Sequence, residues 1–122
     1  MKIRLLLLSI FITHCCTTIE AQSPKIDSLE AYAKTAKPGW DQIDMAIGLG
    51  RLYLVGGFPV EKGNGKIRRL DSLAEVYEIP SAKAYAMVLR NLRAYIYEDD
   101  ADAAIMHCQE AMRIANETNN QD

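Results

Sequence analysis

The chain has 122 residues, of which 49% are hydrophobic and 25% are charged, and its formal net charge is −2. This length suits one small domain with a modest core. Basic residues are not in excess, which argues against the electrostatic surface of a nucleic-acid-binding protein. We therefore expect no nucleic acid among the partners.

The start of the chain has the pattern of an export signal, residues 1–21. Lys2 and Arg4 precede an apolar run over residues 5–12. This run is too short for a membrane-spanning helix, which needs roughly 20 apolar residues. Cleavage after Ala21 would release the remainder. We therefore predict an exported protein, periplasmic if bacterial, without a stable membrane span.

Two other fates of this segment stay open. One is an uncleaved segment that serves as an N-terminal membrane anchor or a buried helix, and the other is a lipid anchor on Cys16. The lipid anchor fits the pattern poorly, because a small residue should precede the modified cysteine and Cys15 or His14 stands there instead. After cleavage at Ala21, Cys108 is the only cysteine, so the mature chain has no internal disulfide.

Two helices are expected in the first half of the mature chain. Ser23-Pro24 suits a helix start, and Pro38-Gly39 would end a leading helix over residues 23–37. The segment 41–55 is broadly apolar, so we expect neighbours on more than one side of it. Gly48 and Gly50 would each weaken this second helix by ~1 kcal/mol relative to Ala. We interpret both as points of close helix contact.

A long loop is predicted over residues 56–65, because this segment is rich in Gly and contains Pro59. Its Gly65-Lys66 pair is followed by Ile67, where a nucleotide-binding loop has Ser or Thr, so we do not expect a phosphate site. A third helix then covers residues 66–79. Its inward face is predicted to carry Ile67, Leu70, Leu73, Ala74 and Tyr77.

Two amphipathic helices are predicted between residues 81 and 116, joined by an acidic turn. The apolar stripe of the first consists of Tyr85, Val88, Leu89, Leu92, Tyr95 and Ile96. The stripe of the second consists of Ala101, Ala104, Ile105, Cys108, Ala111, Met112 and Ala115. Neither helix can bury its stripe alone, so we expect the two to pack on each other and on the earlier helices. Cys108 is expected to be a small buried hydrophobe.

This last helix pair resembles a tetratricopeptide repeat. The resemblance lies in Tyr95, in Ala104-Ile105, and in Ala111 seven residues after Ala104. Leu92 departs from the pattern, because the family prefers Gly or another small residue there, and the closing Pro is absent. An Arg two residues before a Tyr also recurs 42 positions earlier, at Tyr53, against the family's usual spacing of about 34. We attribute the excess to the long loop.

The resemblance implies an all-α fold of stacked antiparallel helix pairs, a fragment of an α-solenoid. We expect about five helices in a domain over residues 22–122, with repeats over about 41–79 and 81–116.

The resemblance further implies that the first helix of each repeat lines a groove. Arg51 and Arg93 then share one repeat position, and Arg90 lies one turn before Arg93. Together with Tyr97 they are the groove candidates, because guanidinium groups can grip the carboxylates of an extended peptide. The alternative is that these arginines are solvated or pair with local acids.

No pattern in the mature chain predicts catalysis, a cofactor or a metal. His107 is its only histidine, and Cys108 points to the opposite side of the same helix, so no Cys–His pair forms. The acidic residues 98–102 lack the spacing of a calcium loop, and we expect them to cap the following helix.

The expected function is therefore non-catalytic binding of a protein or peptide, and not an enzymatic one. The alternative is the N-terminal periplasmic sensing portion of a longer signal-transduction protein, such as a sensor kinase or a transcriptional regulator. We also expect the C-terminal helix to associate with another copy, a partner or a continuation of the array. Met106 and Ile114 lie off its stripe, and no polar capping helix follows it.

Overall fold

The computed structural model describes residues 25–119, which form five helices. The chain divides into two compact units, Met1–Lys34 and Thr35–Asp122. In the first unit residues 25–33 are helical, so the leading helix ends before the predicted residue 37. The predicted export signal, with its two cysteines, lies outside the described residues. Between residues 25 and 119, no helix has both the length and the apolar character needed to cross a membrane.

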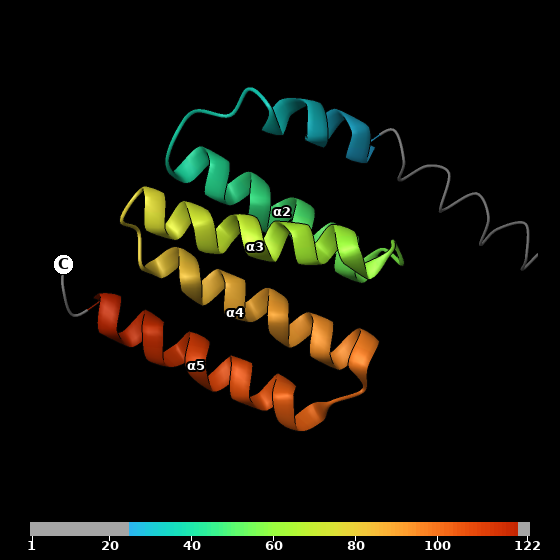
Figure 1. The fold of residues 1–122 in the computed structure, drawn as a ribbon, viewed down its shortest axis with the longest axis vertical. Coiled ribbons are helices and arrows are strands. Elements are labelled where there is room, and N and C mark those ends of the chain that lie inside the picture. The colour runs from blue at the N-terminus through green and yellow to red at the C-terminus, as the bar shows by residue number, and fades with distance from the viewer. Residues whose placement is uncertain (1–24, 120–122) are drawn as a thin grey trace, which may run out of the picture. The chain divides into compact units, whose positions relative to one another are not determined.

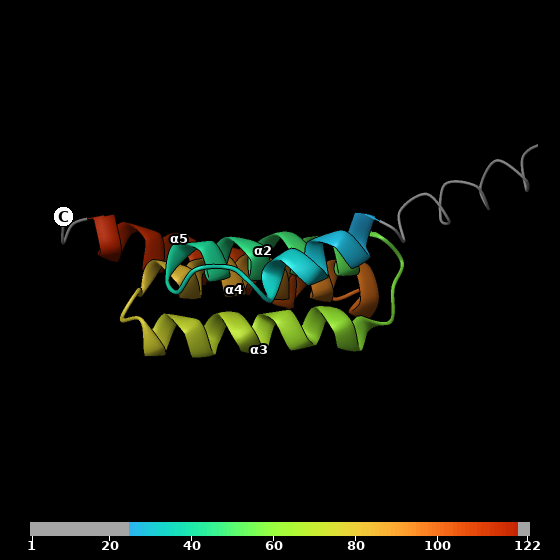
Figure 2. The same cartoon turned by 90° about the horizontal axis from the view of Figure 1, so that it is seen from above.

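The second unit contains four α-helices and one short π-helical segment (Figure 1). Their bounds are α2 Trp40–Val55, α3 Val60–Val76, α4 Ser81–Arg93, η1 Ala94–Glu98 and α5 Ala101–Asn119. Short connections make consecutive helices antiparallel. α2 packs on α3 and α4, α3 packs on α4, and α4 packs on α5. Figure 2 shows α2, α4 and α5 on one side of α3. The predicted all-α class with packed antiparallel helices is confirmed.

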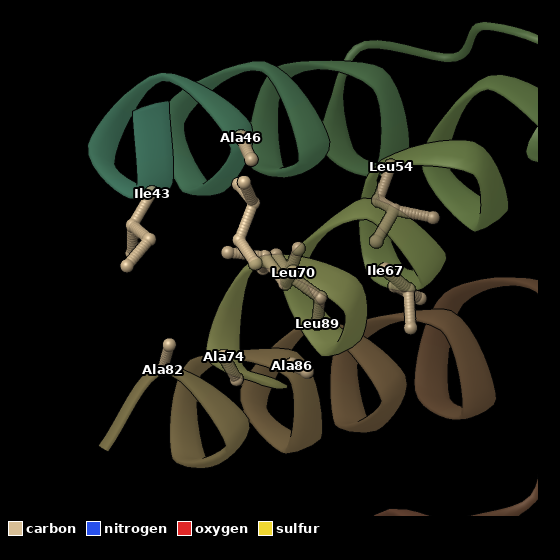
Figure 3. Close-up of a cluster of buried hydrophobic side chains, with 10 residues drawn as sticks. Ile43, Ala46, Leu54, Ile67, Leu70, Ala74, Ala82, Ala86 and Leu89 are labelled. Carbon is tan, nitrogen blue, oxygen red and sulfur yellow. The ribbon is translucent and has the colours of Figure 1, made fainter. Parts of the chain in front are cut away.

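The core of this unit lies between α2, α3 and α4 (Figure 3). It consists of Ile43, Ala46, Leu54, Ile67, Leu70, Leu73, Ala74, Ala82, Ala86 and Leu89. The predicted inward face of the third helix is therefore confirmed. The expectation that the apolar second helix has neighbours on more than one side is also confirmed, because α2 contacts both α3 and α4.

The long loop predicted over residues 56–65 is wrong. Only residues 56–59 join α2 to α3. Gly57 has a φ of +74°, which favours glycine, and Pro59 lies directly before the first turn of α3. The extra separation between the two Arg–Tyr motifs is therefore taken up by helix rather than by loop.

Two glycines of the predicted loop lie inside α3, and one of them has a packing role. Gly63 is buried, and a Cβ atom at this position would overlap the side chain of Leu54 in α2. A Cβ at Gly50 in α2 would lie 2.6 Å from Leu89 Cδ1, which confirms the predicted close contact there. Gly48 is exposed with no atom near its Cβ position, so the same prediction is wrong for that residue.

α4 buries two alanines and one leucine and leaves two of its larger apolar side chains exposed. Ala82, Ala86 and Leu89 are buried, whereas four residues of the predicted inner stripe are exposed, namely Tyr85, Val88, Tyr95 and Ile96. α4 has α2, α3 and α5 as neighbours, and small side chains allow this close approach on several sides. Tyr95, at 71% exposure, falls within η1, where the wider π-helical turn shifts side chains off the stripe of the preceding helix.

Candidate binding groove

A groove of about 420 Å³ runs between α4 and α5. Its lining consists of Ser81, Ala84, Tyr85, Val88, Cys108, Ala111, Met112, Ala115, Thr118 and Asn119. None of these ten residues carries a charged side chain. Ala111 is buried, while Tyr85, Val88 and Met112 are 43%, 46% and 57% exposed. The groove is therefore an apolar depression whose bulky side chains remain open to solvent. We call it the α4–α5 groove.

The two helices approach closely because small residues and one side-chain hydrogen bond hold them together. Ala104 and Ala111 are buried, as predicted. The amide nitrogen Nδ2 of Asn91 in α4 donates to the carbonyl oxygen of Ala104 in α5 at 2.6 Å. The contact uses only part of each apolar stripe, and five other stripe residues line the α4–α5 groove, namely Tyr85, Val88, Cys108, Met112 and Ala115.

The prediction that Cys108 is buried is wrong. The residue is exposed and lines the α4–α5 groove. On α5 it lies one turn from both Ala104 and Ala111, which are buried. Periodicity placed Cys108 on the correct apolar stripe, but only part of that stripe has a helix opposite it.

An aromatic pair borders the groove on the side of α2. The ring centroids of Trp40 and Tyr85 are 6.5 Å apart with an interplanar angle of 89°, an edge-to-face geometry that is favourable for aromatic rings. Trp40 is 46% exposed at the first position of α2. Sequence reasoning missed Trp40, because it placed the helix start one residue later. The signal in the sequence was a single Trp directly after Pro38-Gly39, the pair that was expected to end the leading helix.

The other side of the α4–α5 contact is polar and charged. Two further openings there, of about 530 and 430 Å³, share Met87, Glu110 and Arg113 in their lining. Arg113 forms an ion pair with Glu110 at 2.7 Å. The hydrogen bond from Arg113 holds the pKa of the Glu110 carboxyl below its ordinary value. His107 lines the larger opening.

The predicted arginines do not gather at the α4–α5 groove. Arg90 donates to Asp71 of α3, with its Nη2 2.6 Å from Oδ2. Arg93 donates to Asn64 of α3 at 3.3 Å and pairs with Glu98 at 3.0 Å. Both side chains therefore have local partners in the structure. Arg51 is exposed on α2.

Tyr97, the fourth predicted groove residue, reaches the end of α2. Its hydroxyl lies 3.0 Å from the carbonyl oxygen of Leu54 and 3.1 Å from that of Phe58. The last carbonyls of a helix lack partners within the helix, so a hydroxyl donor there stabilises the end of α2. Tyr97 thus links the π-helical segment to the first helix pair.

Replacing Tyr97 with Phe is expected to lower the free energy of unfolding by about 1 kcal/mol, the usual contribution of one hydrogen bond. The ring remains, so the loss isolates the hydroxyl. Urea denaturation of both proteins measures it. Tyr95→Phe is the matched control, because Tyr95 lies in the same segment and is 71% exposed. Equal stability of Tyr97→Phe and the parent chain would contradict this role.

The acidic turn caps α5 as predicted. The backbone N–H of Ala103 donates to Asp100 Oδ1 at 2.9 Å, and Glu98 is already paired with Arg93. Within residues 25–119, no three or more His, Cys, Asp or Glu side chains are grouped so that they could hold a metal ion.

Comparisons of the chain with protein-family models, with curated proteins and with solved structures gave no match.

Proposed function

We propose that this protein is an exported, non-catalytic module of the tetratricopeptide type that binds a protein or peptide. The observation that supports this function is the α4–α5 groove with its Trp40–Tyr85 border. Apolar grooves on helical scaffolds accept the apolar side chains of a partner segment. Tyr and Trp are enriched where protein interfaces are strongest, because they bury a large area and retain a polar end.

The chemistry of the α4–α5 groove favours binding over catalysis. Its polar side chains are the hydroxyls of Ser81, Tyr85 and Thr118, the amide of Asn119 and the thiol of Cys108. The Thr118 hydroxyl already donates within its own helix, to the carbonyl oxygens of Ile114 at 3.0 Å and Ala115 at 3.1 Å. No carboxylate, histidine or lysine lines the groove, so the commonest groups for a proton-transfer step are missing there.

Site-specific crosslinking tests this function. A photo-crosslinking residue at Val88, in the groove wall, is expected to form a covalent adduct with a defined protein in the cell envelope of the host. The control position is Val76 at the end of α3, which is 68% exposed and away from the groove. Mass spectrometry identifies the adducts. The absence of protein adducts at Val88, or the same adducts at Val76, would reject a binding function for the groove.

A further inference from the structure

Three cations form a line along the contact between α2 and α3. Lys62, Lys66 and Arg69 lie one helical turn apart on the same flank of α3. Lys62 and Arg69 are exposed, and Lys66 is half-buried. We call these three residues the basic stripe. It shares no residue with the lining of the α4–α5 groove, so it is a separate surface of the molecule.

Contacts with the end and the middle of α2 position the first two cations. The ammonium Nζ of Lys62 lies 5.2 Å from the ring centre of Tyr53 and 5.8 Å from that of Phe58. Aromatic faces attract a cation at such distances. Lys66 begins beside Gly50, because a Cβ atom at Gly50 would lie 3.1 Å from the Cβ atom of Lys66. The stripe therefore runs along α2.

A neutral polar contact positions the third cation beside the start of α2. Arg69 Nη2 donates to Oε1 of Gln42 at 3.3 Å, and the Tyr77 hydroxyl donates to the same oxygen at 3.0 Å. The Gln42 amide carries no charge, so it orients the guanidinium group without neutralising it. The same holds for the aromatic rings beside Lys62.

The acidic residues that could neutralise the stripe are engaged elsewhere. Asp71 and Glu75 of α3 face α4, where they pair with Arg90 and Lys83. Each lysine and arginine of α4 and α5 has a carboxylate partner. By contrast, none of the three cations of the basic stripe forms an ion pair with an acidic residue in the described range 25–119. α3 thus separates its charges, with positive charge left unpaired on the α2 side.

The surroundings of the basic stripe narrow the kind of anion that fits it. A helix that lies in a membrane surface inserts its apolar face, but that face of α3 is buried in the core through Ile67 and Leu70. A nucleic-acid surface is typical of chains with an excess of basic residues, whereas this chain has a net charge of −2. The complementary groups are therefore carboxylates of a protein.

We propose that the basic stripe binds an acidic helix of a partner protein, lying along α3. Along the axis of α3 its cations are about 6 Å and about 4.5 Å apart, at 1.5 Å per residue. Carboxylates at positions i, i+4 and i+7 of a second helix have the same spacing. Because α2 already restricts these side chains, binding costs less side-chain entropy. This surface goes beyond the groove function proposed above and does not depend on it.

A pair of synthetic peptides tests this spacing with the purified chain. The probe is an alanine-rich helix of about 20 residues with Glu at i, i+4 and i+7 on one face. The control peptide has the same composition with its Glu residues spread around the helix, and we expect it to bind at least about fivefold more weakly. Fluorescence anisotropy measures both affinities. Equal affinities, or no binding of the probe, would overturn the proposal.

Two neighbouring arginines locate the contact on α3. Arg69→Glu replaces an attraction by a repulsion and is expected to weaken probe binding at least about fivefold. Arg68→Glu is the matched control, because Arg68 is exposed, lies outside the basic stripe and undergoes the same change in charge. Equal affinity of the two variants for the probe would overturn the assignment to the basic stripe.

Salt dependence tests the unaltered chain and so does not rely on the folding of a variant. Probe binding is expected to weaken as sodium chloride is raised, because salt screens exposed charges. Affinity that does not change with salt would overturn the proposal. Tighter binding, at the same salt, to vesicles with an anionic phospholipid or to single-stranded DNA than to the probe would also overturn it.

Discussion

Gly63→Ala is expected to destabilise the protein by about 1–3 kcal/mol, the range for overpacking a well-packed interior. The added Cβ atom would overlap the Leu54 side chain, which is fully buried between α2 and α3. Because buried neighbours surround Leu54, it cannot move aside without displacing them. Chemical denaturation of the two proteins measures the difference in the free energy of unfolding.

Gly65→Ala is the matched control and should have the opposite sign. Gly65 lies in the same helix, and a Cβ atom there meets no other atom within 4 Å. Replacing glycine by alanine in a helix interior removes backbone freedom from the unfolded chain and usually stabilises by about 0.5–1 kcal/mol. Losses of equal size in both variants would contradict the packing of α3 on α2. No gain for Gly65→Ala would contradict a helical conformation at this residue.

This pair of glycines shows why the sequence predicted a loop where a helix begins. Gly and Pro usually mark turns, and residues 56–65 contain both. Of these, only Gly56, Gly57 and Pro59 lie in the turn between α2 and α3. Gly63 is needed because α3 approaches Leu54, a contact with a residue in another helix. Local propensity contains no information about such a contact, since tertiary packing decides it.

The candidate groove was predictable only in part, for a related reason. Periodicity placed Val88, Cys108 and Met112 on the apolar stripes of their helices. It could not tell which part of each stripe has a neighbour opposite it. In the structure the alanines occupy the contact and the larger side chains border the opening. The expected position of the arginines came from the repeat resemblance and stays a prediction; the structure shows that Arg90 donates to Asp71 of α3.

Ala104→Leu is expected to lower the free energy of unfolding by about 1–3 kcal/mol, because it inserts a larger side chain into the α4–α5 contact. Ala104 is 6% exposed, and its carbonyl oxygen accepts the hydrogen bond from Asn91. The larger side chain would push the helices apart and lengthen that bond. Thermal or urea unfolding measures the loss. Ala101→Leu is the control, since Ala101 is exposed at the first position of α5 and should tolerate Leu.

The position of the loss within the fold gives a sharper test of the same substitution. α5 packs mainly on α4 and η1, whereas the core lies between α2, α3 and α4. Separating α5 from α4 should therefore raise hydrogen-exchange rates in α5 more than in α2 and α3. A mass-spectrometric exchange profile of Ala104→Leu resolves these helices. Uniform acceleration across all four helices would show that α5 unfolds only together with the core, and unchanged exchange in α5 would mean that Ala104 does not hold it to α4.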